Sequence, residues 1–285
     1  MSASRQPSAV PDDGPPVTTG PGVAVAVSPH LDDAVFSVGG TLAALAAAGW
    51  TVRVVTCFTA SVPDPSPFAL ACQLDKGIAA DVDYMALRRA EDEAACAVLG
   101  VQPVHLPLPE APHRGYPDPA ALFAGVRGDD RVAAALVPAL RPHLADADLI
   151  FAPQALGDHA DHRIVSETVA ALRPDGLWWR DVPYVSRQPA ASPWRGVPDG
   201  VEAGADISDH LARRVTAAAS YHSQLGFQFG QIGVAPLLRN LAAEEAARLG
   251  LPGAVEALRG RPESLRLIGA VSPALVVPEI PGRSA

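Results

Sequence analysis

The sequence GVAVAVSPHLDDAVFSVGG (residues 22–40) does most to indicate how the chain folds. Its first part, residues 22–28, is a short run of small and β-branched apolar residues, which is typical of a strand covered on both faces. His30, Asp32 and Asp33 follow directly at the end of this run. Burying ionisable groups there costs free energy unless a partner compensates them, so the stretch predicts a strand that leads into a functional site.

The first half of the chain alternates between strand and helix patterns. Apolar runs that favour strands recur downstream of the opening stretch, and runs of helix-forming residues separate them. The strands are expected at 51–59, 101–108 and 147–153, and the helices at 38–50, 84–100 and 131–144, the last one broken near its prolines. This order is typical of βαβ units, so we expect an α/β protein with a mostly parallel sheet.

Three Pro- and Gly-containing segments, 60–82, 109–120 and 186–204, have loop character. Loops of this length in a compact domain are commonly binding loops or mobile segments. The length of the segments 60–82 and 186–204 suggests a pocket for something larger than a monosaccharide. The loop at 109–120 also holds Glu110 and Arg114, which could donate or accept hydrogen bonds with sugar hydroxyls.

The last third of the chain is less regular. Residues 176–185 (GLWWRDVPYV) predict a strand with core aromatics, although an exposed tryptophan there could instead stack on a sugar ring. From residue 206 onward we expect mainly helices, with one strand near 265–271. The sequence YHSQL at 221–225 is interpreted as a packing feature at the end of a helix rather than as a catalytic element.

Composition restricts the class of protein. The formal net charge is −9 and no Lys/Arg-rich run occurs, which argues against nucleic-acid binding. Cys57, Cys72 and Cys96 have no metal-finger or disulfide-framework spacing, which fits a reducing, cytoplasmic location. No apolar run reaches the length of a membrane helix. Residues 1–20 are expected to form a disordered tail, and residues 21–285 a single domain.

A second charged cluster, GDHADH, follows the strand expected at 147–153. Ligands of open α/β sheets bind beyond the carboxyl ends of the strands, so this cluster and the first one could meet at one edge. His159 and His162 are three positions apart and would share a helix face, while Asp161 between them could hydrogen-bond an imidazole. Imidazole and carboxylate form the ligand set of divalent first-row metals, and three such ligands with an open position mark a catalytic zinc site.

Each cluster also has a plain structural reading. Asp32 or Asp33 could cap the helix that follows, and HADH could be an exposed helix start. A structural zinc site is disfavoured because no cysteine lies in either cluster. Both clusters following strands of one α/β pattern favours the functional interpretation.

These motifs resemble a known family. SPHLDD (28–33) looks like the Pro/Ala-His-Pro-Asp-Asp element of the PIG-L (LmbE-like) N-deacetylases, and HADH (159–162) is similar to their downstream His-x-Asp-His element. The resemblance extends over most of the first 175 residues and includes VRVVTCF, RRAE and VLGV. It implies a Rossmann-like three-layer fold, and a zinc-dependent hydrolase that removes the acetyl group from an N-acetylglucosamine-type sugar.

Matched position by position, the resemblance implies that His30, Asp33 and His162 are the metal ligands. It makes Asp32 the general base that accepts a proton from water. Zinc is the metal that the resemblance implies, although other divalent first-row metals bind the same donor types.

The resemblance also implies roles for three further residues. His159, held by Asp161, would stabilise the oxyanion or protonate the leaving amine. Arg88 would contact the substrate, although the adjacent Arg89 leaves the register of that match open. Some relatives carry a catalytic tyrosine two positions before the second motif, and Gly157 stands there in this chain.

The resulting functional hypothesis is metal-dependent hydrolysis of an N-acetyl group on an amino sugar or a glycosylated small molecule. One alternative is an amidase of the mycothiol-conjugate type, which cleaves a larger acyl group with the same residues. A second is a catalytically inactive sugar-binding relative, and a third is a non-haem Fe(II) oxygenase, whose His-x-Asp element His30 and Asp32 would match. Asp32 argues against a pure binding protein, because binding alone needs no unligated carboxylate beside the metal.

Overall fold

The computed structural model describes residues 21–271 and 275–276, so the tail expected at 1–20 lies outside the described residues. Its strands form one eight-stranded sheet in the order β3-β2-β1-β4-β5-β7-β6-β8. The strands are β1 (Val23–Ser28), β2 (Thr51–Thr56), β3 (Gln102–His105), β4 (Leu149–Pro153), β5 (Leu177–Trp179), β6 (Val201–Asp206), β7 (Val255–Gly260) and β8 (Leu275–Val276).

The sheet has a parallel part and an antiparallel part. β3, β2, β1, β4 and β5 pair in parallel, whereas β7, β6 and β8 continue the sheet through antiparallel pairs. The predicted three-layer α/β fold with a mostly parallel sheet is therefore confirmed. The strand expected near 265–271 is wrong, because those residues belong to a helix and the strand precedes them at Val255–Gly260.

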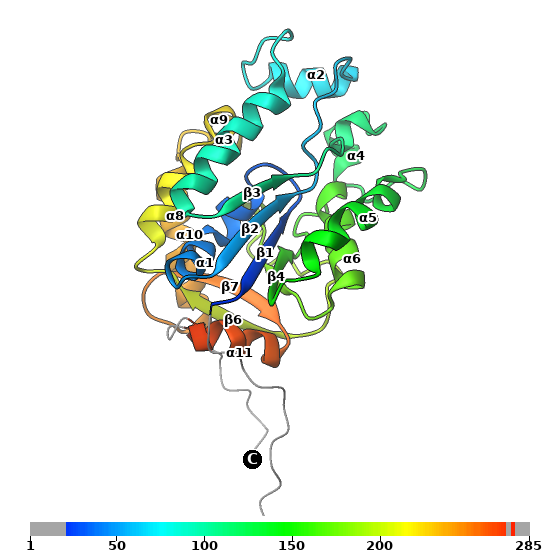
Figure 1. Ribbon diagram of the computed structural model, residues 1–285. Helices are drawn as coiled ribbons and strands as arrows, with labels where there is room; N and C mark the ends of the chain where they lie inside the picture. The colour runs from blue at the N-terminus through cyan, green and yellow to red at the C-terminus, as the bar shows by residue number, and fades with distance from the viewer. Residues whose placement is uncertain (1–20, 272–274, 277–285) are drawn as a thin grey trace, which may run out of the picture.

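Helices cover both faces of the sheet (Figure 1). They are α1 (Asp33–Ala47), α2 (Pro67–Leu74), α3 (Tyr84–Leu99), α4 (Pro119–Leu122), α5 (Val132–Leu144), α6 (Ala160–Leu172), α7 (Tyr184–Arg187), α8 (Leu211–Ala218), α9 (His222–Phe229), α10 (Val234–Leu249), α11 (Pro262–Val271) and the 3₁₀ turn η1 (Ala111–His113). No helix in the described part of the chain is long and apolar enough to cross a membrane.

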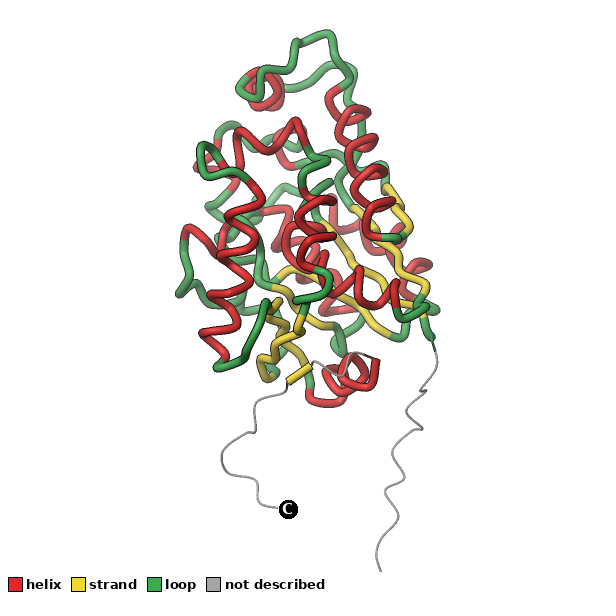
Figure 2. Tube along the Cα trace, turned by 90° about the vertical axis from the view of Figure 1, so that its left-hand side faces the viewer, coloured by secondary structure: helices red, strands yellow, loops and turns green. Residues whose placement is uncertain are grey.

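Alternate residues of the central strands feed two separate cores. On β1, Ala24 and Ala26 face a core shared with α1, α3, α8 and α10, and Figure 2 shows helices of this layer in front of the sheet. Val25 and Val27 face the opposite core, shared with α5 and α6. This period of two, with both faces apolar, is why the opening stretch reads as an unbroken apolar run.

Two helices differ from the sequence prediction. α5 is continuous from Val132 to Leu144, so the predicted break near its prolines is wrong. Its prolines are exposed, where water can solvate the carbonyls they leave unpaired, while Leu136 and Leu140 bury the opposite face. α1 begins at Asp33, five residues earlier than expected, which places one aspartate of the motif in its first turn.

The topology brings the two charged motifs together. From β1 the chain runs outward through β2 to β3, and then returns to the other side of β1 for β4 and β5. The strand order therefore reverses between β1 and β4, and ligands of open α/β sheets bind at such a switch point. The loops that carry His30 and His159 leave β1 and β4 at this edge, the end of the sheet where α2 and α4 lie (Figure 1).

Candidate active site

The turn after β1 has an unusual backbone. Asp32 has φ 153°, a region that non-glycine residues rarely adopt, and its side chain makes no capping hydrogen bond to α1. Asp33 Oδ2 instead accepts a hydrogen bond from the backbone N–H of His30 at 2.9 Å. The capping interpretation of the aspartate pair is therefore wrong for both residues. Strain of this kind is tolerated mainly at functional sites.

The second motif starts α6 directly opposite. His159 is the N-cap residue of α6, and Asp161 and His162 lie in its first turn, fully buried. The structure brings the two motifs into contact and forms two overlapping triads of potential metal ligands. They are His30, Asp33 and His162, and His30, His159 and Asp161, with ligand atoms within 4.8 Å of one another in each.

The carboxylate of Asp161 orients His30. Asp161 Oδ2 lies 2.9 Å from His30 Nε2, and its other oxygen accepts a hydrogen bond from Arg114 at 2.6 Å. His159 receives only the backbone N–H of Asp161, at 3.2 Å from its Nδ1. The expectation that the Asp161 side chain holds His159 is therefore wrong. The guanidinium of Arg114 binds two carboxylates, those of Asp161 and Asp130, and is therefore fully engaged.

His162 has a comparable support that the sequence analysis missed. Its Nδ1 lies 2.7 Å from Asp181 Oδ1, and both side chains are completely buried. Its Nε2 faces Asp33 Oδ2 at 3.3 Å and has no hydrogen-bond partner. Asp181 follows β5, so the rule that ligands bind beyond parallel strand ends could have found it.

The triad of His30, Asp33 and His162 fits a divalent metal. Each imidazole turns one nitrogen to a supporting carboxylate, which leaves the other nitrogen, His30 Nδ1 and His162 Nε2, about Asp33 Oδ2 at 3.2 and 3.3 Å. Carboxylates that fix the tautomer in this way are the usual partners of metal-bound histidines. Although burial raises the pKa of Asp33, His162 and His30 hold it well below its usual value. Two imidazole nitrogens and one carboxylate oxygen around a common point form a donor set that suits a divalent first-row metal.

The second triad is less free to bind. The carboxylate oxygens of Asp161 are already engaged by Arg114, the N–H of Ala111 and His30. The Nδ1 of His159 is occupied as an acceptor. We therefore regard Asp161 as a supporting group rather than a ligand.

Asp32 is buried beside this triad without a hydrogen bond to its Oδ2. The nearest cationic group is Arg88, whose guanidinium lies 3.6 Å away and also pairs with Glu110. Burial raises the pKa of Asp32 to about 8, and the charge of Asp33 adds to the effect. The raised pKa makes the ionised form of this carboxylate a stronger proton acceptor than an exposed aspartate.

Arg88, rather than its neighbour, belongs to this site. The guanidinium of Arg89 donates to the backbone carbonyl of Thr59 at 2.6 Å and to Ser61, away from the triad of His30, Asp33 and His162. Arg88 is 5% exposed and holds Asp32 and Glu110 together at the bottom of the pocket. Of the two adjacent arginines, Arg88 is therefore the one that lines the pocket.

His159 presents a hydrogen-bond donor to the pocket. Because its Nδ1 accepts the N–H of Asp161, the proton of the neutral ring is carried by Nε2. Burial lowers the pKa of His159 to about 3, and His30 contributes in the same direction. The ring of Phe123 packs edge-on against it, with 5.2 Å between centroids.

Gly157, which stands where some relatives have a tyrosine, is covered by a different tyrosine. A side chain at this position would meet the ring of Tyr184 at 3.0 Å, and φ of Gly157 is +85°. Tyr184 lines the pocket and packs edge-on against His162, at 5.2 Å between ring centroids. The tyrosine ring beside His162 thus comes from α7 and not from position 157.

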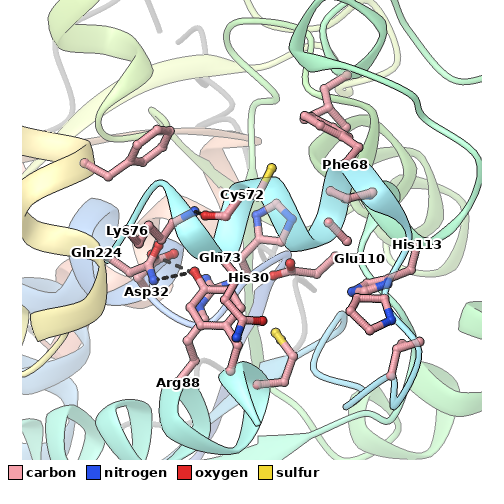
Figure 3. Close-up of a pocket in the computed structure, with 18 of the residues that line it drawn as sticks. His30, Asp32, Phe68, Cys72, Gln73, Lys76, Arg88, Glu110, His113 and Gln224 are labelled. Carbon is pink, nitrogen blue, oxygen red and sulfur yellow. Dashed lines mark hydrogen bonds and ion pairs between the residues drawn. The ribbon is translucent and has the colours of Figure 1, made fainter. Parts of the chain in front are cut away.

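These groups open into a cavity of about 600 Å³, lined by α2, α3, α4 and α9 as well as by the two motifs. Figure 3 shows His30, Asp32, Arg88 and Glu110 in the part of the cavity that α2 crosses. Trp178 and Trp179 are fully buried, so the core-strand interpretation is confirmed and stacking on a sugar is excluded. Glu110 lines the cavity as expected, whereas Arg114 does not.

The comparisons with known proteins agree with this geometry. Residues 25–172 match the model of the PIG-L family, described as GlcNAc-PI de-N-acetylase. A 2'-N-acetylparomamine deacetylase of Streptomyces fradiae is 33% identical over 212 residues, which cover 70% of this chain and 72% of that protein.

Solved structures are similar over most of the chain. A deacetylase of the teicoplanin biosynthesis pathway superposes with a TM-score of 0.72 at 26% identity, covering 83% of this chain and 96% of that one. A zinc-inhibited form of teicoplanin deacetylase gives a TM-score of 0.70 at 25% identity, covering 83% and 97%.

Proposed function

The chain belongs to the PIG-L family of de-N-acetylases, and on this basis we propose that it hydrolyses the N-acetyl group of an amino sugar or of a small glycosylated molecule. The products are acetate and a free amine. One observation carries the proposal: two imidazoles and the carboxylate of Asp33 converge, and a second carboxylate, Asp32, lies beside them without a hydrogen-bond donor on Oδ2.

We propose zinc as the metal, held by His30, Asp33 and His162. Bound zinc would lower the pKa of a water molecule to about 7 and polarise the amide carbonyl. The mixed imidazole and carboxylate donors support zinc, as does the zinc-inhibited form of a related deacetylase, while Fe(II) or Co(II) also suit such donors. Asp161 and Asp181 would draw the proton of each neutral ring to the nitrogen that faces them, which would leave the nitrogens beside Asp33 for the metal.

Asp32 would accept the proton of the attacking water at its unpartnered Oδ2. Arg88 forms an ion pair with this carboxylate and holds it beside the triad, and the same guanidinium also pairs with Glu110. The Nε2–H of His159 would donate a hydrogen bond to the oxygen that becomes negative as the carbonyl is attacked. Of the two roles implied for His159, stabilisation of the oxyanion suits its tautomer better than protonation of the amine.

The test is amine release from N-acetylglucosamine glycosides by protein stripped of metal with a chelator and then reloaded with zinc. We expect no release from the stripped protein and recovery with about one equivalent of zinc. The His162→Ala variant should bind less than stoichiometric zinc by elemental analysis. Full metal content in this variant, or undiminished turnover after stripping, would overturn the assignment.

An amidase that cleaves a larger acyl group would use the same reacting residues. A panel of amino sugars with N-acetyl, N-propionyl and N-hexanoyl groups separates the two activities. We expect kcat/KM to fall as the acyl chain lengthens, and a rise along the series would favour the amidase. A relative that only binds sugars would release no amine from any member of the panel.

A further inference from the structure

The second triad, formed by His30, His159 and Asp161, has the same donor types as the first, and its ligand atoms lie within 4.8 Å of one another. An arginine distinguishes the two triads. The guanidinium of Arg114 donates to Asp161 Oδ1 at 2.6 Å, whereas Asp33 makes its printed ion pairs with histidines, at 3.2 and 3.3 Å. A permanent positive charge thus lies against the carboxylate of the second triad.

Arg114 is held in place from several sides. Its guanidinium also pairs with Asp130 at 3.0 Å, donates to the carbonyl of Pro109 at 2.6 Å and lies 4.8 Å from the centre of the Phe58 ring. Its side chain is 8% exposed. The charge is therefore fixed against Asp161, where water and salt screen it little.

A carboxylate can orient a histidine in this protein without an arginine. Asp181 contacts His162 Nδ1 at 2.7 Å through one oxygen and accepts the backbone N–H of Leu156 at 3.1 Å with the other. Among the described residues, Asp181 makes no salt bridge with an arginine. An uncharged donor is therefore enough to complete this pair.

The pair of Asp92 with His105, at 2.8 Å, is also completed by an uncharged donor. The phenol of Tyr221 donates to the other oxygen of Asp92 at 2.7 Å. Tyr221 is the N-cap residue of α9, so the YHSQL sequence begins a helix instead of ending one. Asp161 likewise has an uncharged donor, the N–H of Ala111 at 3.0 Å, so the additional arginine indicates a role beyond orienting an imidazole.

His30 belongs to both triads through different nitrogens. Its Nδ1 lies 3.2 Å from Asp33 Oδ2, and its Nε2 lies 2.9 Å from Asp161 Oδ2. A neutral imidazole carries a proton on one nitrogen and a free lone pair on the other. Neutral His30 can therefore serve one triad at a time, and a metal ion in the second triad would take a ligand from the first.

We propose that Arg114 is a positioning residue that excludes the metal ion from the second triad and so directs it to His30, Asp33 and His162. Its positive charge repels a divalent cation from Asp161. Asp161, while paired with Arg114, still faces His30 Nε2 and favours a proton on that nitrogen. The inference rests on the proposed metal-dependent function, and it makes the position of the metal depend on a residue that does not line the cavity.

The test restores metal binding to a variant that lacks a ligand. His162→Ala disrupts the first triad alone, so this variant should bind less than stoichiometric zinc. Adding Arg114→Gln should strengthen zinc binding by about tenfold or more and return the content to about one equivalent, because the second triad becomes available. Elemental analysis gives the content, and competition with a chromogenic chelator gives the affinity. A further His159→Ala should abolish the recovered binding.

Controls address charge and folding. Arg127→Gln added to His162→Ala removes an arginine from the same segment between β3 and α5, but Arg127 is 38% exposed and pairs with a surface aspartate, so zinc binding should not recover. Arg114→Lys keeps a cation near Asp161 and should not restore binding either. Arg114→Gln also leaves Asp130 without its counter-charge. If that variant unfolds, its combination with Asp130→Asn removes the stranded charge and should give the same recovery.

The outcomes separate the inference from the proposed function. A wild-type protein that binds no zinc would refute the metal centre itself. No recovery of zinc binding when Arg114→Gln is added to a folded His162→Ala protein would overturn the role of Arg114. Recovery that survives His159→Ala, or that Arg127→Gln also produces, would overturn the second triad as the excluded position. Recovered binding that depends on His159 can come neither from unfolding nor from a general change in charge, so it would support the inference.

Discussion

Two buried carboxylates, one at the start of α1 and one beside its middle, have contrasting surroundings. Asp32, at the start of the helix, has no hydrogen-bond donor on Oδ2 and only Arg88 near it, at 3.6 Å. Glu256 of β7 accepts hydrogen bonds from the N–H groups of Gly40 and Thr41 at 2.8 and 2.7 Å, and from the Thr41 hydroxyl. It also lies 3.1 Å from Arg214.

This contrast indicates what each charge does. A buried carboxylate that is fully hydrogen-bonded stabilises the fold, because its desolvation is compensated where it lies. One that lacks donors costs free energy and persists where a reaction needs it. In the proposed mechanism, the parallel half of the sheet carries the reactive group, while Glu256 of the antiparallel half anchors the helix that presents it.

The largest expected effect is at Asp32. Asp32→Asn removes the proton acceptor but keeps the shape of the side chain, so kcat should fall by about a hundredfold or more. Zinc content should stay near one equivalent, and thermal stability should not decrease, because Asp32 Oδ2 has no hydrogen bond to lose. The measurements are amine release, elemental analysis and a melting curve. Near-normal turnover would show that Asp32 is not the base.

Asp181→Asn should have the next largest effect. Without the negative charge behind His162, the affinity for zinc should fall by about tenfold to a hundredfold, measured by competition with a chromogenic chelator. Asp92→Asn is the control, because Asp92 is as buried as Asp181, at 1% exposure, and pairs with His105 at 2.8 Å, away from the triad. Weakened zinc binding in both variants would point to a general loss of structure.

The residues in these predictions differ in how well the sequence alone could identify them. His30, Asp33 and His162 follow strands whose apolar runs are recognisable locally, so their meeting at one edge could be expected from the topology of parallel sheets. Asp181 could be found only by extending the same rule to β5, a strand of three residues. The pairing of Asp161 with His30 instead of His159 depends on side-chain directions across 131 positions, which no local spacing encodes.

The antiparallel half was harder to predict for a different reason. β6 (VEAGAD) and β7 (VEALRG) mix charged residues, glycine and alanine, and contain few of the β-branched and aromatic residues that mark a strand. Their strand character comes from pairing with each other over six residues and with β5. Tertiary context also overrides local propensity in α5, where the buried leucines outweigh two prolines.

Glu256→Gln tests whether the fully hydrogen-bonded carboxylate stabilises the fold. The substitution leaves the guanidinium of Arg214, 2% exposed, without its counter-charge and directs an amide donor at other donors. Breaking a buried pair in this way should lower the free energy of unfolding by about 3 kcal/mol in urea denaturation. At a temperature where the variant is folded, kcat should remain within about threefold of the wild type. A hundredfold loss of kcat in the folded variant would make Glu256 functional and end the contrast.

Thr41→Val should have the smallest effect and makes the comparison quantitative. Valine has nearly the shape of threonine, so the change removes only the hydroxyl that donates to Glu256 at 2.6 Å. The same carboxylate oxygen keeps the N–H of residue 41, and the other keeps that of Gly40. We expect a loss of about 1 kcal/mol in the free energy of unfolding, with kcat unchanged. If Thr41→Val cost as much as Glu256→Gln, the hydroxyl would be indispensable to the buried charge. A smaller loss in the free energy of unfolding means that Glu256 tolerates the loss of one hydrogen-bond donor because its other donors remain. Asp32 Oδ2 has no such donors.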